Sequence, residues 1–271
     1  MKNNLAIVLG TNVNKSLSPL IFNYWFLKYS IDGRYNYKEI KKNELNKQIK
    51  KILNQKDICG LNITIPFKEE IITHLDSIDE DSKKIGAVNC VTIKKNKTHG
   101  SNTDWVGYSN ALKEKTNKYD RIDKEAIIIG YGGAAKAILY AILKLEYKKV
   151  HIFNRTLKKL KNIENNRVKA YPISDIKHHI KSSNLIINTT PVNVLRDIDT
   201  SRILSPNTVV SDVVYRPLET NFLKYFKNSQ RKIYGVSMLI NQAAPCFKKW
   251  FGVTPIIDEK LLEIVKKEIS I

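Results

Sequence analysis

The chain has 271 residues, of which 42% are hydrophobic, and this is enough for one large core or two smaller ones. Its 46 Lys and Arg residues exceed its 26 Asp and Glu residues, which gives a formal net charge of +20 at pH 7. No apolar run reaches the roughly 18 residues of a membrane-spanning helix, and the first residues are too short an apolar run for a signal peptide, so we expect a soluble, cytoplasmic protein of two domains.

The first third of the chain alternates strand-like and helix-like segments. We predict strands over residues 5–9, 34–40, 60–65 and 88–93, and helices over 43–53 and from Pro66 to about Leu75. Ser18-Pro19 is typical of a helix start, because serine caps free amides and proline suits the first helical position.

From residue 126 the pattern becomes a compact strand–helix series. The predicted strands are 126–130, 150–153, 185–188, 208–213 and 232–235, with helices over 133–145, after Thr156, and over 237–250 and 256–269. Strands that alternate with helices indicate a parallel sheet covered on both faces. The polar stretch near residues 112–124 is the expected crossing between domains.

The positive charge has two interpretations, a nucleic-acid surface or attraction of anionic small molecules. A nucleic-acid surface would gather its charge beside stacking aromatic residues. The lysines are instead spread along the chain, as in Lys41-Lys42, Lys94-Lys95, Lys148-Lys149 and Lys248-Lys249. We therefore expect compositional bias with steering of anionic ligands, and neither a nucleic-acid nor a membrane partner.

The cysteines Cys59, Cys90 and Cys246 form neither a metal-ligand spacing nor a C-x-x-C pair. We expect them to be ordinary reduced core residues, and we expect no metal site.

The motif Gly130-Tyr131-Gly132-Gly133-Ala134-Ala135 fits the dinucleotide-binding pattern G-x-G-x-x-G/A. It lies between a predicted strand and a predicted helix, where the amides of the helix start would face a pyrophosphate. An ordinary tight turn is the alternative, and the strand–motif–helix context disfavours it.

The next predicted strand ends in Asn154-Arg155-Thr156, where an NAD site usually carries Asp or Glu. The guanidinium group of Arg155 can instead pair with the 2′-phosphate of NADP, and Lys158 and Lys159 add positive charge. The alternative is that these residues form a basic helix start exposed to solvent. This alternative fits the two lysines better than it fits Arg155.

Residues 60–68 are the most informative stretch. Strand alternation places Asn62 and Thr64 on one face and apolar residues, Ile65 included, on the other. A strand buried on both faces should not be so polar, so we predict that Asn62 and Thr64 line a cleft that Lys68 reaches from the first turn of the next helix. The alternative is that Asn62 and Thr64 cap loops and that Lys68 is exposed to solvent.

Asp104 precedes the apolar-periodic segment 106–112, so a helix N-cap is by itself a sufficient explanation. Taken together with Lys68, it forms a candidate acid/base pair in which the carboxylate orients the ammonium group.

Several motifs follow one another along the chain: Ser16-Leu17-Ser18-Pro19, Asn62-Ile63-Thr64-Ile65-Pro66-Phe67-Lys68, Gly86-Ala87-Val88-Asn89, Asn102-Thr103-Asp104, the glycine motif, Asn154-Arg155-Thr156, Asp212-Val213-Val214-Tyr215 and Gly235-Val236-Ser237-Met238-Leu239-Ile240-Asn241-Gln242. In this order and spacing the chain resembles the shikimate dehydrogenases over nearly its whole length.

The resemblance implies an N-terminal α/β substrate-binding domain of residues 1–103 and 238–271, and a Rossmann NADP-binding domain of residues 104–237, with C-terminal helices that pack back on the first domain. It implies NADP-dependent, reversible reduction of 3-dehydroshikimate to shikimate in chorismate and aromatic amino acid biosynthesis, with Lys68 and Asp104 as the catalytic pair. The implied substrate ligands are Ser16, Ser18, Asn62, Thr64, Asn89, Asp104, Tyr215 and Gln242. The implied cofactor-binding residues are Gly130, Gly132, Gly133, Ala134, Ala135, Asn154, Arg155, Thr156, Val213, Gly235 and Met238.

The chain departs from the family pattern in two places. Asn193 and Val194 stand where the family usually has glycine and methionine, and Trp105 stands where it often has glycine. The sequence therefore does not define the local shape of the site at these positions. Met238 either walls the nicotinamide site or packs in the core, and both roles stay open.

Three alternatives remain at this point. A quinate/shikimate dehydrogenase with relaxed substrate or cofactor use is disfavoured by Ser18 and Arg155, and a non-catalytic NADP-binding regulator by the retention of Lys68 and Asp104. An RNA-binding enzyme similar to glutamyl-tRNA reductase would use the basic charge, but the chain is short for it and lacks a nucleophilic-cysteine motif. The oligomeric state stays open, with a homodimer among the options.

Overall fold

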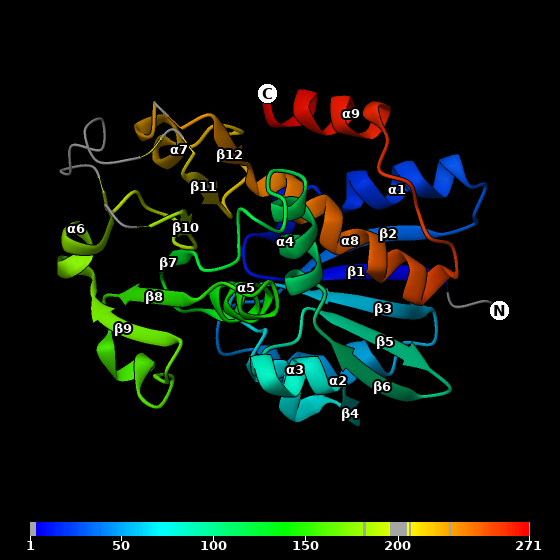
Figure 1. The fold of residues 1–271 in the computed structure, drawn as a ribbon. Helices are drawn as coiled ribbons and strands as arrows, with labels where there is room; N and C mark the ends of the chain where they lie inside the picture. Colours follow the sequence, from blue (N-terminus) through cyan, green and yellow to red (C-terminus); the bar gives the residue numbers. More distant parts are fainter. Residues whose placement is uncertain (1–3, 181–182, 196–204, 206, 228, 271) are drawn as a thin grey trace. The chain divides into compact units, whose positions relative to one another are not determined.

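The structure is a computed structural model that describes residues 4–180, 183–195, 205, 207–227 and 229–270 (Figure 1). The chain forms two compact units, Met1–Val106 with Leu239–Glu268 and Gly107–Met238 with Ile269–Ile271. The divisions fall inside the helices α4 (Asp104–Lys113), α8 (Gly235–Phe251) and α9 (Glu259–Ser270), so the polar stretch 112–124 belongs to the second unit. Within the described residues, no helix is long and apolar enough to cross a membrane.

The first unit contains a mixed six-stranded sheet in the order β2-β1-β3-β5-β6-β4. Its strands are β1 (Leu5–Gly10), β2 (Arg34–Glu39), β3 (Ile58–Ile63), β4 (Ser77–Ile78), β5 (Cys90–Lys94) and β6 (Lys97–Ser101). β1 pairs in parallel with β2 and β3, whereas β5 pairs antiparallel with β3 and β6. The β5–β6 hairpin turns at Lys95 and Asn96, which have φ of 50° and 58°. Two successive positive φ angles are typical of a tight hairpin turn, but this turn lacks the usual glycine, and β6 is therefore missing from the prediction.

Helices cover both faces of this sheet. They are α1 (Ser18–Lys28), α2 (Leu45–Leu53), α3 (Glu80–Ile85), α8 and α9 (Glu259–Ser270), together with the 3-10 helices η1 (Val13–Lys15) and η2 (Glu70–His74). On one face α2 shares an apolar core with the strands, which includes Leu9, Leu45, Ile49, Leu61 and Ile63. On the other face the ring of Phe22 in α1 stacks on Tyr35 of β2, with centroids 4.1 Å apart. A Cβ atom on Gly60 would lie 2.2 Å from Trp250, so this glycine lets α8 approach β3 closely.

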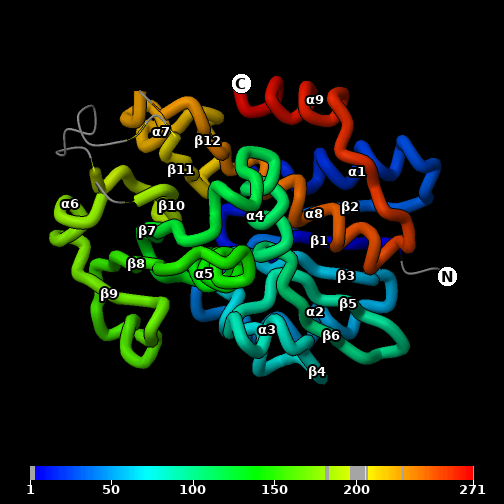
Figure 2. Tube along the Cα trace, in the orientation of Figure 1, coloured from blue at the N-terminus to red at the C-terminus, as the bar shows by residue number. Residues whose placement is uncertain are grey.

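The C-terminal helix packs on the N-terminal part of the first unit, as the family resemblance implies (Figure 2). The hydroxyl of Tyr24 in α1 donates to both carboxylate oxygens of Asp258 at 2.9 Å, and the ammonium group of Lys28 pairs with the same carboxylate. Because Asp258 also accepts from the backbone N–H of Leu261 at 2.9 Å, one side chain anchors the start of α9 to α1.

The helix predicted from Pro66 to Leu75 is wrong. The chain runs through turns after the cis Ile65–Pro66 bond, and only the 3-10 helix η2 follows. The backbone groups are bonded elsewhere: the carbonyl of Lys68 accepts from Val88 N at 2.8 Å rather than from a residue four positions on. Lys68 therefore lies in a turn. Ile65 is 68% exposed rather than buried, because β3 and its alternation end at Ile63.

The second unit contains an all-parallel six-stranded sheet in the order β12-β11-β10-β7-β8-β9. Its strands are β7 (Glu125–Ile129), β8 (Lys149–Asn154), β9 (Val168–Pro172), β10 (Leu185–Asn188), β11 (Val209–Asp212) and β12 (Arg231–Ile233). Its further helices are α5 (Gly133–Lys144), α6 (Ile176–His179) and α7 (Asn221–Tyr225), with the 3-10 helices η3 (Leu157–Leu160) and η4 (Ile173–Asp175). The predicted α/β class with a Rossmann-type domain is confirmed.

Two local predictions for this unit are corrected. The helix expected after Thr156 is only the single 3-10 turn η3, and β9 follows it unpredicted. The last strand ends at Ile233 instead of 235, because Gly235 is the first residue of α8.

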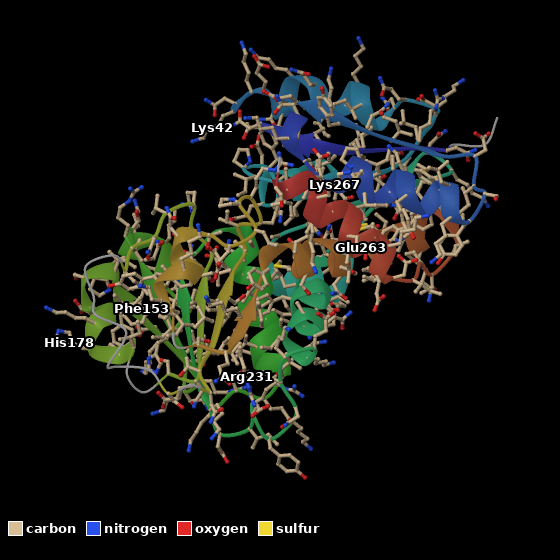
Figure 3. The ribbon with its side chains drawn as sticks, turned by 90° about the horizontal axis from the view of Figure 1, so that it is seen from above. Lys42, Phe153, His178, Arg231, Glu263 and Lys267 are labelled. Atoms are coloured by element: carbon tan, nitrogen blue, oxygen red, sulfur yellow. The ribbon has the colours of Figure 1, made fainter. Side chains whose placement is uncertain are left out.

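A group of aromatic and imidazole rings packs between β8, β9 and α6. Phe153 of β8, labelled in Figure 3, belongs to it through its stacking on Tyr171. The ring of His179 lies 4.3 Å from that of Tyr171 and 5.2 Å from that of His151, measured between centroids. Burial lowers the pKa of His179, and the neighbouring His151 and His178 lower it further, against the opposing effect of Asp175 and Glu125. The folded protein therefore prefers the neutral imidazole of His179.

We expect the stability of the chain to fall as the pH drops below the unfolded histidine pKa of about 6.5. Above that pH His179 is neutral in both states, whereas below it the unfolded chain binds the proton first. Melting temperatures about one unit above and one unit below pH 6.5 measure the slope. His179→Phe keeps an aromatic ring and should flatten that slope. His99→Gln is the control, because His99 is exposed in β6 and outside this group of rings, and it should leave the slope unchanged. An unaltered slope in His179→Phe would contradict the assignment.

Candidate active site

Lys68 and Asp104 form an ion pair in the first unit. The ammonium nitrogen of Lys68 lies 2.6 Å from Oδ2 of Asp104, and the two side chains are 13% and 6% exposed. The carboxylate does not cap its own helix, because Asn102 Oδ1 accepts from the backbone N–H groups of Asp104 at 3.0 Å and Trp105 at 3.4 Å. Asn102 thus leaves the Asp104 side chain free to pair with Lys68.

Asn89 holds the other oxygen of this carboxylate. Its Nδ2 donates to Asp104 Oδ1 at 2.9 Å and also lies 2.9 Å from Thr103 Oγ1 and 3.1 Å from Gln242 Oε1. Its Oδ1 accepts from the backbone N–H of Thr103 at 2.6 Å. Asn89 is buried at the end of the turn before β5, and its amide hydrogens are shared among protein acceptors. The side chain therefore orients the ion pair, and its contact with substrate stays a prediction.

Asn62 is fixed by two residues that the sequence analysis missed. Its Oδ1 accepts from the Tyr35 hydroxyl at 2.7 Å, and its Nδ2 donates to the carbonyl of Asn89 at 3.1 Å and to Sγ of Cys246 at 3.2 Å. Cys246 follows Gln242 by four positions in α8, and this spacing places both on one helix face, a signal that could have found it. Cys246 is buried, as expected, but it is no ordinary core residue.

The serine and threonine hydroxyls lie near the ends of β3 and α1. Ser16 Oγ accepts from the backbone N–H of Ser18 at 3.2 Å, while the residue that caps α1 is Leu17, so Ser18 is no cap. Ser18 is 4% exposed. The methyl group of Thr64 packs on Gly10, and its hydroxyl has no hydrogen-bond partner among the residues that the structure describes.

The glycine turn of the second unit joins β7 to α5. Gly130 has φ of 96°, and a Cβ atom there would lie 2.6 Å from Thr189 Oγ1, so only glycine fits. An added Cβ on Gly132 would meet nothing within 4 Å, and no side chain caps the start of α5. The amides of this helix start, at Gly133 and Ala134, are thus open to a ligand, while Ala135 is buried against the sheet. This geometry suits the pyrophosphate of a dinucleotide.

The end of β8 presents exposed polar groups. Asn154 Nδ2 donates to the carbonyl of Thr156 at 2.9 Å and shapes the turn around Arg155. Arg155 is exposed, and no carboxylate among the described residues pairs with it. Lys158 and Lys159 follow in η3 and are exposed too. The guanidinium group of Arg155 is therefore available to an anionic ligand.

Asp212 connects two loops at the carboxyl ends of β10 and β11. Its carboxylate accepts from Thr220 Oγ1 at 2.6 Å, from Val214 N at 3.0 Å and from Asn188 Nδ2 at 3.2 Å. Burial raises the pKa of Asp212, and these hydrogen bonds partly offset the rise. A Cβ atom on Gly235 would lie 2.5 Å from the carbonyl oxygen of Val213, so the glycine permits a close approach there.

The structure groups the predicted residues by unit. The first unit joins Asn62, Asn89 and Gln242 to the Lys68–Asp104 pair through the hydrogen bonds above. It also contains Thr64, two residues after Asn62, and Ser16 and Ser18 at the start of α1. The second unit carries the predicted cofactor residues, including Met238, and also Tyr215, which is predicted to bind substrate.

Asn193 and Val194 take structural roles in the second unit. Asn193 Oδ1 accepts from Leu195 N at 3.0 Å, and Val194 packs against the apolar core beneath the sheet. Trp105, the other departure from the family pattern, is half-buried.

Comparisons with known proteins agree with this arrangement. Residues 8–91 match the family model described as the shikimate dehydrogenase substrate binding domain, and residues 111–208 match that of shikimate / quinate 5-dehydrogenase. A shikimate dehydrogenase (NADP(+)) of Rhizobium meliloti is 35% identical over 97% of this chain and 94% of its own.

Two solved structures resemble the whole chain. Shikimate dehydrogenase from Aquifex aeolicus is 31% identical, with a TM-score of 0.84 over 98% of this chain and 97% of its own. Shikimate 5-dehydrogenase from Thermus thermophilus, in complex with NADP(H) and shikimate, is 28% identical, with a TM-score of 0.83 over 98% of this chain and 99% of its own. The chain belongs to the shikimate dehydrogenase family.

Proposed function

We infer that this chain is an NADP-dependent shikimate dehydrogenase, an oxidoreductase that acts on a CH–OH group and interconverts 3-dehydroshikimate and shikimate. The observation that carries the proposal is the nearly buried Lys68–Asp104 pair at 2.6 Å, held by the neutral amide of Asn89 in a chain of this family. The reaction belongs to the biosynthesis of chorismate and the aromatic amino acids.

Lys68 and Asp104 carry the proton transfer. In the reducing direction, bound NADPH would supply the hydride for reduction of the C3 carbonyl carbon. Lys68 donates a proton to the carbonyl oxygen, and Asp104 keeps the ammonium group pointed at that atom through its 2.6 Å contact. In the oxidising direction Lys68 accepts the hydroxyl proton, so the same pair serves both directions.

The substrate ligands in this proposal are Ser16, Ser18, Asn62, Thr64, Asn89, Tyr215 and Gln242. Hydroxyls and amides suit a polyhydroxylated ring, because a site built to satisfy hydroxyl groups rejects analogues that lack them. The hydroxyl of Thr64, which no described side chain engages, is the clearest free group for such a ligand.

The cofactor in this proposal is NADP, held in the second unit. The open side of Gly132 and the uncapped start of α5 would take the pyrophosphate, and Arg155 would take the 2′-phosphate. Gly130, Ala135, Asn154, Thr156, Val213, Gly235 and Met238 would shape the surrounding turns and walls.

Initial rates with shikimate and with quinate, each with NADP and with NAD, test the assignment. We expect the highest kcat/KM for shikimate with NADP. Comparable values for quinate or for NAD would identify an enzyme of relaxed specificity instead. No turnover with any of the four combinations, in protein that binds NADP, would identify a regulator.

Alanine at both Ser16 and Ser18 should raise the KM for shikimate about 10- to 100-fold, the effect expected when hydrogen bonds to a carboxylate are lost. The KM for NADP should not change, and the melting temperature should fall only slightly, because the single bond lost inside the protein at Ser16 is local. A large fall in melting temperature with unchanged shikimate affinity would show that these hydroxyls serve the fold alone.

We place the reaction in the cytoplasm, where fractionation of cells that express a tagged chain would test the location. A homodimer is the first oligomeric state to test, by sedimentation of the purified protein.

A further inference from the structure

The side chain of Asn62 has little hydrogen-bonding capacity left for a ligand. Both hydrogens of its amide nitrogen are directed at protein acceptors, the carbonyl of Asn89 and the thiol sulfur of Cys246. Its oxygen accepts from the hydroxyl of Tyr35 at 2.7 Å, which leaves one lone pair on Oδ1. A ligand hydroxyl could therefore only donate to Asn62, and only at Oδ1.

Tyr35 fixes the oxygen end of this amide. It is buried in β2 with its ring stacked on Phe22, so the hydroxyl cannot swing away from Asn62. Burial raises the pKa of Tyr35 well above its ordinary value, and the hydroxyl keeps its proton across the working pH range. The donor to Oδ1 is thus permanent.

Cys246 fixes the nitrogen end. Its sulfur lies 3.2 Å from Asn62 Nδ2 and 3.2 Å from Thr103 Oγ1, and its own backbone is held in α8. Thr103 in turn contacts Asn89, which donates to the Asp104 carboxylate at 2.9 Å. A continuous chain of hydrogen bonds therefore runs from Tyr35 through Asn62 and Cys246 to the ion pair.

We propose that Tyr35 and Cys246 are positioning residues for substrate, which clamp the Asn62 amide so that its Oδ1 faces the ligand as a fixed acceptor. The inference deepens the proposed function and rests on it, because it takes shikimate as the ligand of Asn62. It assigns specificity to the clamp: a substrate hydroxyl that donates at this point is accepted, and an analogue with only an acceptor there is rejected.

Simple packing is the competing explanation for both side chains. A packing role would lower the melting temperature without a selective effect on one substrate. A clamp predicts a raised KM for shikimate with an unchanged KM for NADP, and recovery when an acceptor returns at position 246.

Tyr35→Phe and Cys246→Ala, each of which removes one contact to Asn62, test the clamp. Both should raise the KM for shikimate about 3- to 10-fold, the effect of one hydrogen bond, with kcat changed less. Cys246→Ser restores an acceptor and should recover most of the loss. Cys59→Ala is the matched control, because Cys59 is a buried thiol of β3 that hydrogen-bonds to the carbonyl of Leu5, and this variant should have the shikimate KM of the wild type.

Shikimate KM values for Tyr35→Phe and Cys246→Ala within twofold of the wild type would overturn the clamp, as would equal increases for shikimate and NADP. Cys246→Ser guards against a failure to fold, because it keeps the size and polarity of the site. Turnover of shikimate by the wild-type protein tests the proposed function, whereas only the ratios among variants test the clamp. An inactive wild type would contradict the proposed function. Equal KM values across the variants of an active enzyme would contradict only the clamp.

Discussion

Replacing Lys68 by alanine is expected to lower kcat about 10²- to 10⁴-fold, the range for loss of a positioned acid/base group. The KM for shikimate should change much less, because the predicted ring contacts come from other side chains. The expectation rests on the 2.6 Å pair with Asp104, whose side chains are 13% and 6% exposed. Steady-state kinetics of the purified variant measure both constants.

A double variant tests whether the two residues act as one unit. Lys68→Ala with Asp104→Ala should cost little more than the worse single variant, because neither residue works without the other. Lys83→Ala is the matched control: Lys83 also pairs with a carboxylate, that of Glu80, but both side chains are exposed, and kcat should not change. Near-normal turnover in folded Lys68→Ala would reject the catalytic role, and multiplied losses would reject the coupled pair.

Replacing Arg155 by alanine is expected to raise the KM for NADP about 10- to 100-fold and to leave the KM for NAD nearly unchanged, because only NADP carries the 2′-phosphate. Arg155 is exposed at the end of β8, where no described carboxylate competes for it. Initial rates with each cofactor at saturating shikimate measure the two constants.

Lys159→Ala is the control for general positive charge near the cofactor, since Lys159 is an exposed cation in η3. Its effect on the KM for NADP should be far smaller than that of Arg155→Ala. Equal losses for NADP and NAD in Arg155→Ala would show that the arginine supports the fold of the turn rather than the phosphate.

The sequence predicts the sheets and the glycine turn because their signals are local. Apolar runs bounded by turn residues locate β3, β7, β10 and β11 to within a few residues, and Gly130 stands where φ is positive. Likewise, polar side chains on an otherwise buried strand single out Asn62, and the structure places it in the hydrogen-bond network of the Lys68–Asp104 pair.

Signals that depend on tertiary partners are absent from the sequence. Pro66 suits a helix start as well as a turn, and the carbonyl of Lys68 bonds to Val88, a residue twenty positions on, so no local pattern could exclude the predicted helix. Tyr35 and Tyr37 alternate identically in β2, yet one is buried beside Asn62 and the other is 51% exposed. Only the covering helices decide between them.

The contacts of Asn89 restrict the chemistry that position can hold. Its side chain must donate at one end, to the Asp104 carboxylate at 2.9 Å, and accept at the other, from the backbone of Thr103 at 2.6 Å. An aspartate of identical shape would offer no donor and would set a second anion against Asp104, competing for the positive charge of Lys68. The site thus contains one cation and one anion, and a single neutral amide keeps that balance. Spontaneous hydrolysis of this amide would convert the pair into a triad of one lysine and two carboxylates.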